Sequence, residues 1–126
     1  KLENLNRNNA LRMKQALYLM DSLRGSSLKT IKLTNHQSSV FHQFPILTEE
    51  RDSLLKFLKK RGVNCGIYYP IPLSKMRAFK KNYRIERTKS SNAELASKKI
   101  LSLPIGPHLD LKDSEYIANT IQSFQI

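Results

Sequence analysis

The first 24 residues carry an apolar stripe at helical spacing, and this feature limits most strongly how the chain can fold. The stripe is followed by Gly25, where a helix end favours a residue that tolerates positive φ. The opposite face is polar, as in a helix that buries only one side. We therefore predict a helix over residues 1–24, packed through Leu2, Leu5, Ala10, Met13, Leu17, Met20 and Leu23.

Three later segments have the composition of strands. Residues 38–47, "SSVFHQFPIL", are rich in β-forming residues, and Pro45 predicts an edge position or an irregular end. Residues 63–69, "VNCGIYY", alternate apolar and polar positions and predict a second strand. A short extended segment is expected at "ILSLP", residues 100–104.

Three further helices are expected between and after these strands. Thr48 is the predicted N-cap of a helix with acidic residues in its first turn, basic residues in its last, and Gly62 at its end. Ser91 and Glu94 have capping-box spacing and predict a helix to about Lys99. Asp110 is the predicted N-cap of the last helix.

This order of elements predicts an α/β (α+β) fold, in which helices cover a small, mainly antiparallel sheet. A chain of 126 residues is long enough to bury one modest core. We expect a single domain over residues 1–126, with a helix at 1–24 and a sheet-and-helix part at 38–126.

Charge and cysteine content limit the classes of partner and compartment. Lys and Arg number 22 against ten Asp and Glu, a net charge of +12, which suits nucleic acid, an anionic membrane or a phosphorylated ligand. Cys65 stands alone, so no internal disulfide can form, and a reducing, cytoplasmic location is expected. No apolar run approaches the roughly 20 residues that span a bilayer, so no membrane anchor is expected.

The sequence lacks the common signatures of cofactor and metal sites. Its four glycines form neither a P-loop nor a dinucleotide-binding motif. His36, His42, Cys65 and His108 do not have metal-ligand spacing. We therefore expect no metal, no cofactor and no catalytic residue on this chain alone.

The segment "GIYYPIPL", residues 66–73, places two tyrosines directly before two prolines. Pro70 and Pro72 fix φ and cannot donate ladder hydrogen bonds, so they end the strand and hold Tyr68 and Tyr69 in a rigid turn. Either the tyrosines serve a binding site, or at least one is a core residue whose hydroxyl reaches solvent.

Several segments together resemble the C-terminal domain of DegT-type sugar aminotransferases. These are "VFHQFPI", "RDSLLKFLKKRGVNCGIYYPIPL", "NAELASKKILSLPIGPHL" and the last amphipathic helix. The resemblance implies the small domain of a fold-type-I enzyme, with residues 1–24 as the link helix. Such enzymes use pyridoxal phosphate to move an amino group from an amino acid, commonly glutamate, to a keto sugar on a nucleotide.

The resemblance also implies what this sequence does not contain. The family's large domain carries the lysine that binds the cofactor, and no matching region is present. The chain alone is therefore expected to be inactive, as part of a parent enzyme that binds pyridoxal phosphate, a nucleotide-sugar substrate and a second copy of itself.

Four residues are candidates for substrate contacts through the same resemblance. Tyr68 and Tyr69 match the two positions before the first proline, and His42 matches a histidine on the first strand. Ser74 stands where the family usually has His, and Met76 stands where it has Gln, which implies an altered substrate or a lost activity in the parent.

Two other interpretations remain open from the sequence. The basic segments "KFLKKR" and "AFKKNYRIERTK" can contact nucleic-acid phosphates, with Phe79 and Tyr83 available for stacking. The same residues are also typical of a solvated face, and we expect only weak, non-specific binding. A regulatory role is the third interpretation.

Overall fold

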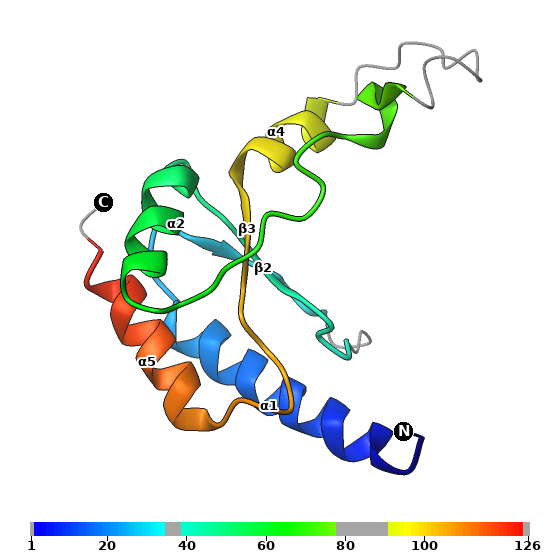
Figure 1. The fold of residues 1–126 in the computed structure, drawn as a ribbon, viewed down its shortest axis with the longest axis vertical. Helices are drawn as coiled ribbons and strands as arrows, with labels where there is room; N and C mark the ends of the chain where they lie inside the picture. Colours follow the sequence, from blue (N-terminus) through cyan, green and yellow to red (C-terminus); the bar gives the residue numbers. More distant parts are fainter. Residues whose placement is uncertain (1, 35–38, 78–90, 125–126) are drawn as a thin grey trace.

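A computed structural model describes residues 2–34, 39–77 and 91–124 (Figure 1). Helices and short strands alternate along these residues, and the sheet is antiparallel, which confirms the predicted fold class. The described elements are η1 (Leu2–Asn4), α1 (Leu5–Ser22), β1 (Lys29–Thr30), β2 (Phe44–Leu47), α2 (Arg51–Lys60), η2 (Leu73–Lys75), α4 (Ser91–Lys99), β3 (Ile100–Leu103) and α5 (Leu111–Gln122).

The sheet has the order β1-β2-β3, so Pro45 lies in its central strand and the predicted edge position is wrong. Pro45 is opposite Ser102 of β3, whose N–H and C=O are bonded on the other side to Gly66. The Pro45 nitrogen therefore points toward the β1 side, where β1 pairs only with Ile46 and Leu47. The N–H that proline lacks would lie beyond the end of β1, so the sheet loses no ladder hydrogen bond at Pro45.

The strand predicted at residues 63–69 is also wrong. Only Gly66 pairs with the sheet: its N–H donates to Ser102 O at 3.0 Å and its C=O accepts from Ser102 N at 2.8 Å. Tyr69 then has φ of 59° and precedes Pro70, so the backbone leaves the sheet direction. β1 was not predicted, because a two-residue strand carries no periodicity.

Local signals set most helix ends. Gly25 and Gly62 have φ of 81° and 76° after α1 and α2, as predicted. Asp110 caps α5 and forms a reciprocal capping box with Asp113. α4 is described from Ser91 to Lys99, and the residues before Ser91 lie outside the described ranges.

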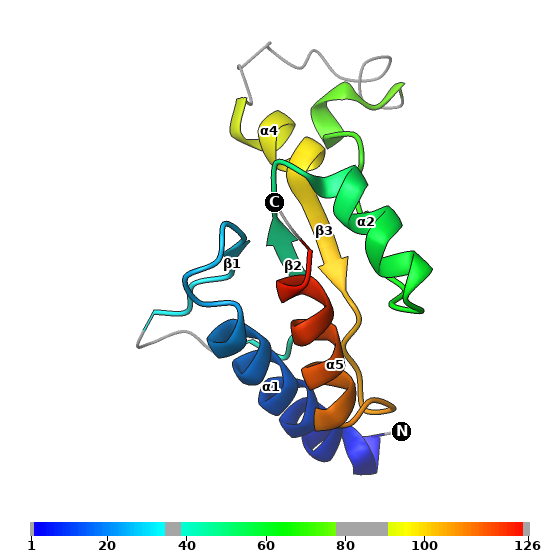
Figure 2. The ribbon, with the colours of Figure 1, turned by 90° about the vertical axis from the view of Figure 1, so that its left-hand side faces the viewer.

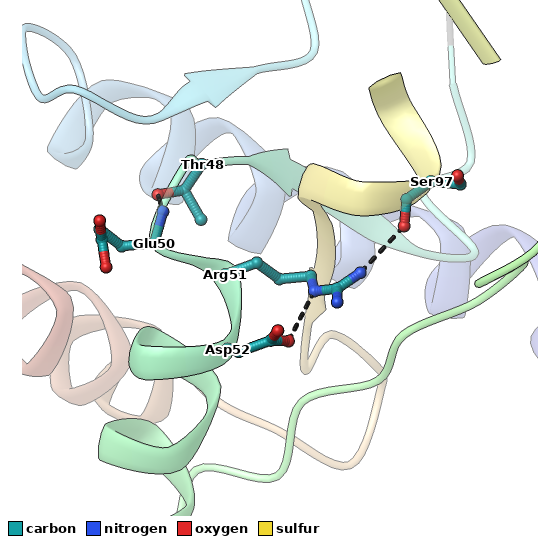
Figure 3. Close-up of polar contacts among 5 residues, drawn as sticks. All are labelled: Thr48, Glu50, Arg51, Asp52 and Ser97. Carbon is teal, nitrogen blue, oxygen red and sulfur yellow. Dashed lines mark hydrogen bonds and ion pairs between the residues drawn. The ribbon is translucent and has the colours of Figure 1, made fainter. Parts of the chain in front are cut away.

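The start of α2 differs from its prediction, because the helix begins at Arg51 and its N-cap is Glu50. The Thr48 hydroxyl instead accepts from Glu50 N at 3.1 Å in the preceding turn (Figure 3). Figure 3 also shows the Arg51 guanidinium reaching α4, where it donates to Ser97 O at 2.9 Å. The Arg51 guanidinium also donates a hydrogen bond to the Asp52 carboxyl group, and this bond lowers the pKa of Asp52.

One hydrophobic core joins α1, α2, α5 and the sheet. α1 and α5 lie side by side in both views and run in the same direction (Figures 1 and 2). Among the described residues, the largest fully buried side chains are Leu19, Leu23, Phe41, Phe44, Ile46, Leu54, Leu58 and Leu101. The predicted apolar side of α5 is confirmed, with Ile117 and Ile121 buried and Phe124 packed against the core. The predicted packing of α1 is wrong in part, because Leu2, Leu5 and Leu17 are exposed and its buried residues are Gln15, Ala16 and Leu19.

Within the described ranges, no helix combines the length and the apolar character needed to cross a membrane.

Candidate functional site

A hollow of about 230 Å³ lies beside the Gly66–Ser102 pair, and we call it the histidine–tyrosine hollow. It gathers residues from three parts of the chain: the segment before β2, the segment after α2, and the end of β3 with the loop that follows it. Its polar lining residues are His42, Gln43, Asn64, Tyr68, Ser102 and His108. Donors and acceptors line this hollow without any carboxylate or lysine, a set that suits hydroxyl groups and anions.

Two glycines make room for the rings at this hollow. A Cβ on Gly66 would lie 2.7 Å from Cε2 of Tyr68, and a Cβ on Gly106 would lie 2.5 Å from Cε1 of His108. Both distances are shorter than Cβ contacts in real proteins. The Tyr68 and His108 rings therefore occupy space that only glycine leaves free.

Backbone strain flanks two of the candidate residues. Phe41, directly before His42, has φ of 44°, and Tyr69, directly after Tyr68, has φ of 59°. For bulky residues this left-handed region costs about 1–3 kcal/mol, and such strain gathers at functional sites. The Phe41 side chain is buried, with its ring 6.1 Å from that of Phe44, which holds this conformation in place. The backbone strain at Phe41 and Tyr69 supports the interpretation that the hollow is a functional site.

The structure places the four predicted substrate residues in two groups. His42 and Tyr68 both line the hollow. Tyr69, 68% exposed, and Ser74, in η2, do not line it. Both tyrosines are exposed, so the core interpretation of the tyrosine–proline corner is wrong.

Sequence reasoning missed His108, which lines the hollow from the loop after β3. It was treated only as a histidine without metal-ligand spacing. The signal that could have found it is its place in "LSLPIGPHL", one of the segments that carry the family resemblance. His36, Phe79 and Tyr83 lie outside the described residues.

A larger hollow, of about 500 Å³, lies between α1 and residues 107–112, but it contains none of the candidate residues. Another, of about 250 Å³, is lined by Lys29 and Lys99, and the Lys99 ammonium is paired with Glu49. We favour the histidine–tyrosine hollow although it is the smaller one, because its lining carries imidazole, amide and hydroxyl groups and includes the candidate residues His42 and Tyr68. In the part of the chain that the structure describes, no three His, Cys, Asp or Glu side chains are grouped to hold a metal ion.

Comparison with known proteins identifies the family. The family model for the DegT/DnrJ/EryC1/StrS aminotransferases matches residues 1–122. The chain therefore belongs to this aminotransferase family.

Curated relatives include enzymes with nucleotide-sugar substrates in their names. A UDP-2-acetamido-2-deoxy-3-oxo-D-glucuronate aminotransferase of Pseudomonas aeruginosa is 33% identical over 87% of this chain and 30% of its own length. A pleiotropic regulatory protein of Geobacillus stearothermophilus is 33% identical over 84% of this chain and 28% of its own. The chain thus spans about a third of the length of these relatives.

Solved structures of the family superimpose closely. A DegT DnrJ EryC1 StrS aminotransferase from Brucella abortus has a TM-score of 0.88 at 29% identity, over 98% of this chain and 32% of that one. DesV of S. venezuelae, in complex with a ketimine intermediate, has a TM-score of 0.87 at 27% identity, over 96% of this chain and 33% of that one. The described fold is therefore that of a sugar-aminotransferase segment.

Aminotransferases of this family use pyridoxal phosphate, and the histidine–tyrosine hollow does not fit that cofactor. Among the described residues, its lining includes no lysine to bind the aldehyde and no carboxylate to pair with the pyridine nitrogen.

Proposed function

We propose that this chain is the C-terminal, substrate-facing domain of a sugar aminotransferase. The parent enzyme would transfer an amino group from an amino acid, with glutamate as the expected donor, to a keto sugar carried on a nucleotide. One observation carries the proposal: within a family match over residues 1–122, His42 and Tyr68 meet at a hollow with no carboxylate. The nucleotide-sugar names of several relatives support the substrate class.

In this proposal the hollow's side chains bind and orient the substrate. The Tyr68 hydroxyl and the His42 imidazole are placed to bond sugar hydroxyls or diphosphate oxygens. Tyr69 and Ser74 lie outside the hollow and would contact the substrate at its rim. The basic surplus of the chain favours the approach of a diphosphate.

The proposal also includes a large domain that supplies the cofactor site, a homodimeric parent and a cytoplasmic location. Cys65, as the single cysteine, supports the reducing compartment. The chain alone is expected to be inactive, because the lysine that binds the cofactor would belong to the large domain.

The test compares the 126-residue chain with the full-length parent. Mixed with pyridoxal phosphate, the chain should give no saturable, lysine-specific absorbance band, whereas the parent should bind the cofactor and aminate a nucleotide keto sugar with glutamate. A stoichiometric lysine adduct on the chain would contradict its dependence on the large domain. A parent that binds no nucleotide sugar would contradict the assignment itself.

A regulatory role is a second candidate, since one relative is named a pleiotropic regulatory protein, and nucleic-acid binding is a separate one that rests on the basic surplus of the chain. The basic end of α2 is partly committed to packing: the Arg61 guanidinium lies 3.6 Å above the Phe57 ring, and Arg61 O accepts from the Tyr116 hydroxyl at 3.0 Å. Lys56, Lys59 and Lys60 are exposed opposite the buried face, as in an ordinary solvated helix. These contacts favour the enzyme proposal.

A further inference from the structure

Gln15 is a buried polar residue on α1 that bonds a segment far along the chain. Only 3% of its surface is exposed. Its Nε2 donates to Gly106 O at 2.9 Å and to Leu109 O at 2.6 Å, and its Oε1 accepts from Gly106 N at 3.0 Å. The side chain thus ties α1 to the loop between β3 and α5, which descends to α1 in Figure 1.

These three hydrogen bonds hold a tight turn, residues 106–109, at its first and last residues. Leu109 N donates to Gly106 O at 3.1 Å and closes a four-residue turn, with Pro107 at the position that proline favours. Both Nε2 protons of Gln15 are used, so the amide has one arrangement that satisfies it. A buried, fully bonded amide fixes its partners because any displacement leaves polar groups unpaired.

His108 is the third residue of this turn and lines the histidine–tyrosine hollow. Its ring lies against Gly106, the residue that Gln15 bonds through both N–H and C=O. Gln15 itself does not line that hollow. Any effect of Gln15 on the hollow must therefore pass through the turn and its histidine.

We propose that His108 is a further substrate-contacting residue and that Gln15 is its positioning residue. This inference rests on the proposed function, because it assigns roles within the same hollow. His108 presents a ring nitrogen that can bond a sugar hydroxyl or a diphosphate oxygen in the hollow that Tyr68 also lines. Gln15 fixes the position of His108 by holding residues 106–109 against α1.

A matched control separates positioning from simple stabilisation. Gln122 on α5 donates to Ser22 O on α1 at 2.8 Å, so it is a second glutamine whose amide bonds a backbone carbonyl across α1, at the other end of α5 from the turn. It lies outside the hollow's lining. Gln122→Met therefore removes a tie between α1 and α5 without touching the turn.

The first experiment records NMR signals of the His108 imidazole and the Tyr68 ring in the 126-residue chain, without ligand. Gln15→Met should shift the His108 signals, whereas Gln122→Met should leave them at their wild-type positions. If Gln15→Met does not fold, Gln15→Glu keeps the acceptor for Gly106 N but loses a donor to the two carbonyls, and the same shift is expected. Unchanged His108 signals in a folded Gln15 variant would overturn the positioning role.

The second experiment is a double-mutant cycle in the full-length enzyme with a nucleotide keto sugar. His108→Ala should lower kcat/KM about twofold to thirteenfold, the effect of one lost hydrogen bond. Gln15→Met should lower it by a similar factor, and adding Gln15→Met to His108→Ala should lower it no further. Additive losses, or an unaffected His108→Ala variant, would overturn the proposal.

The two experiments also separate this inference from the proposed function. An enzyme without activity on nucleotide sugars refutes the proposed function and, with it, the substrate contact of His108. The NMR comparison needs no substrate, so it decides independently whether Gln15 sets the position of that ring.

Discussion

Gly66→Ala is expected to disturb the histidine–tyrosine hollow while leaving the fold almost as stable as before. The new Cβ would lie 2.7, 2.8 and 3.0 Å from Cε2, Cζ and the hydroxyl oxygen of Tyr68. Ordinary contact begins at 3.4 Å, so the ring must move by about 0.7 Å, the difference between 3.4 and 2.7 Å. The ring is 48% exposed and has room to move outward.

The stability effect of this substitution is small because two terms oppose each other. Gly66 has no positive φ, so alanine is tolerated there, and the reduced entropy of the unfolded chain stabilises by about 0.4–1 kcal/mol. Displacing a half-exposed ring offsets this by a similar amount. We expect the free energy of unfolding to change by less than about 1 kcal/mol.

The kinetic effect is larger, because the displaced hydroxyl loses its substrate bond. One such bond is worth about 0.5–1.5 kcal/mol, so kcat/KM of the full-length enzyme should fall about twofold to thirteenfold. Urea unfolding measures the first quantity and steady-state kinetics the second. In a Tyr68→Ala background, Gly66→Ala should not change kcat/KM further.

Two results would refute this reasoning. Unchanged kcat/KM would mean that the position of Tyr68 does not matter to the substrate. A loss of more than about 2 kcal/mol of stability would mean that Gly66 is required by the backbone rather than by the ring.

Three further predictions concern local stability, thiol chemistry and charge. Asp110→Ala removes the cap of α5 and should lower the free energy of unfolding by about 0.5–2 kcal/mol in urea, and an unchanged midpoint would argue against the capping box. Burial raises the pKa of Cys65 to about 12, so alkylation at pH 8 should be much slower in the folded chain than in urea, and equal rates would contradict that burial. Because the folded pKa lies above the ordinary value of 9.0, the stability from the neutral thiol is present below about pH 9 and is lost as pH rises toward 12. Oligonucleotide binding should be weak and non-specific at moderate salt, and sub-micromolar affinity with a salt slope reduced by replacing Lys80, Lys81 and Arg84 would favour the nucleic-acid interpretation.

Several helix ends that depend on neighbouring residues were predictable from the sequence, although the predicted N-cap at Thr48 was wrong. Gly25, Gly62 and Asp110 act through local backbone geometry and hydrogen bonds within a turn, so their sequence signals were sufficient. The strand predicted around Gly66 was wrong because alternation does not reveal that Tyr69 takes a positive φ. The central place of Pro45 depends on how far β1 extends, which no local pattern specifies.

The candidate site was predictable only in part. The family resemblance selected His42 and Tyr68, and the structure brings both to one hollow. Gln15 was missed because its significance comes from contacts across 91 residues or more, and His108 because it lines the hollow with residues distant in the sequence. A single sequence shows that these residues are polar, but not that a buried amide and a turn meet beside a tyrosine.

The kinetics of the tyrosine variants in the full-length enzyme test the account most directly. Tyr68→Phe and Tyr69→Phe, singly and together, remove hydroxyls from the corner without removing the rings. The account predicts that at least one of them, with Tyr68 expected from its place in the hollow, raises KM severalfold to about a hundredfold, while the cofactor's spectrum stays unchanged. If both single variants and the double variant keep wild-type kcat/KM and lose stability instead, the corner is structural and this domain does not face the substrate through its tyrosines.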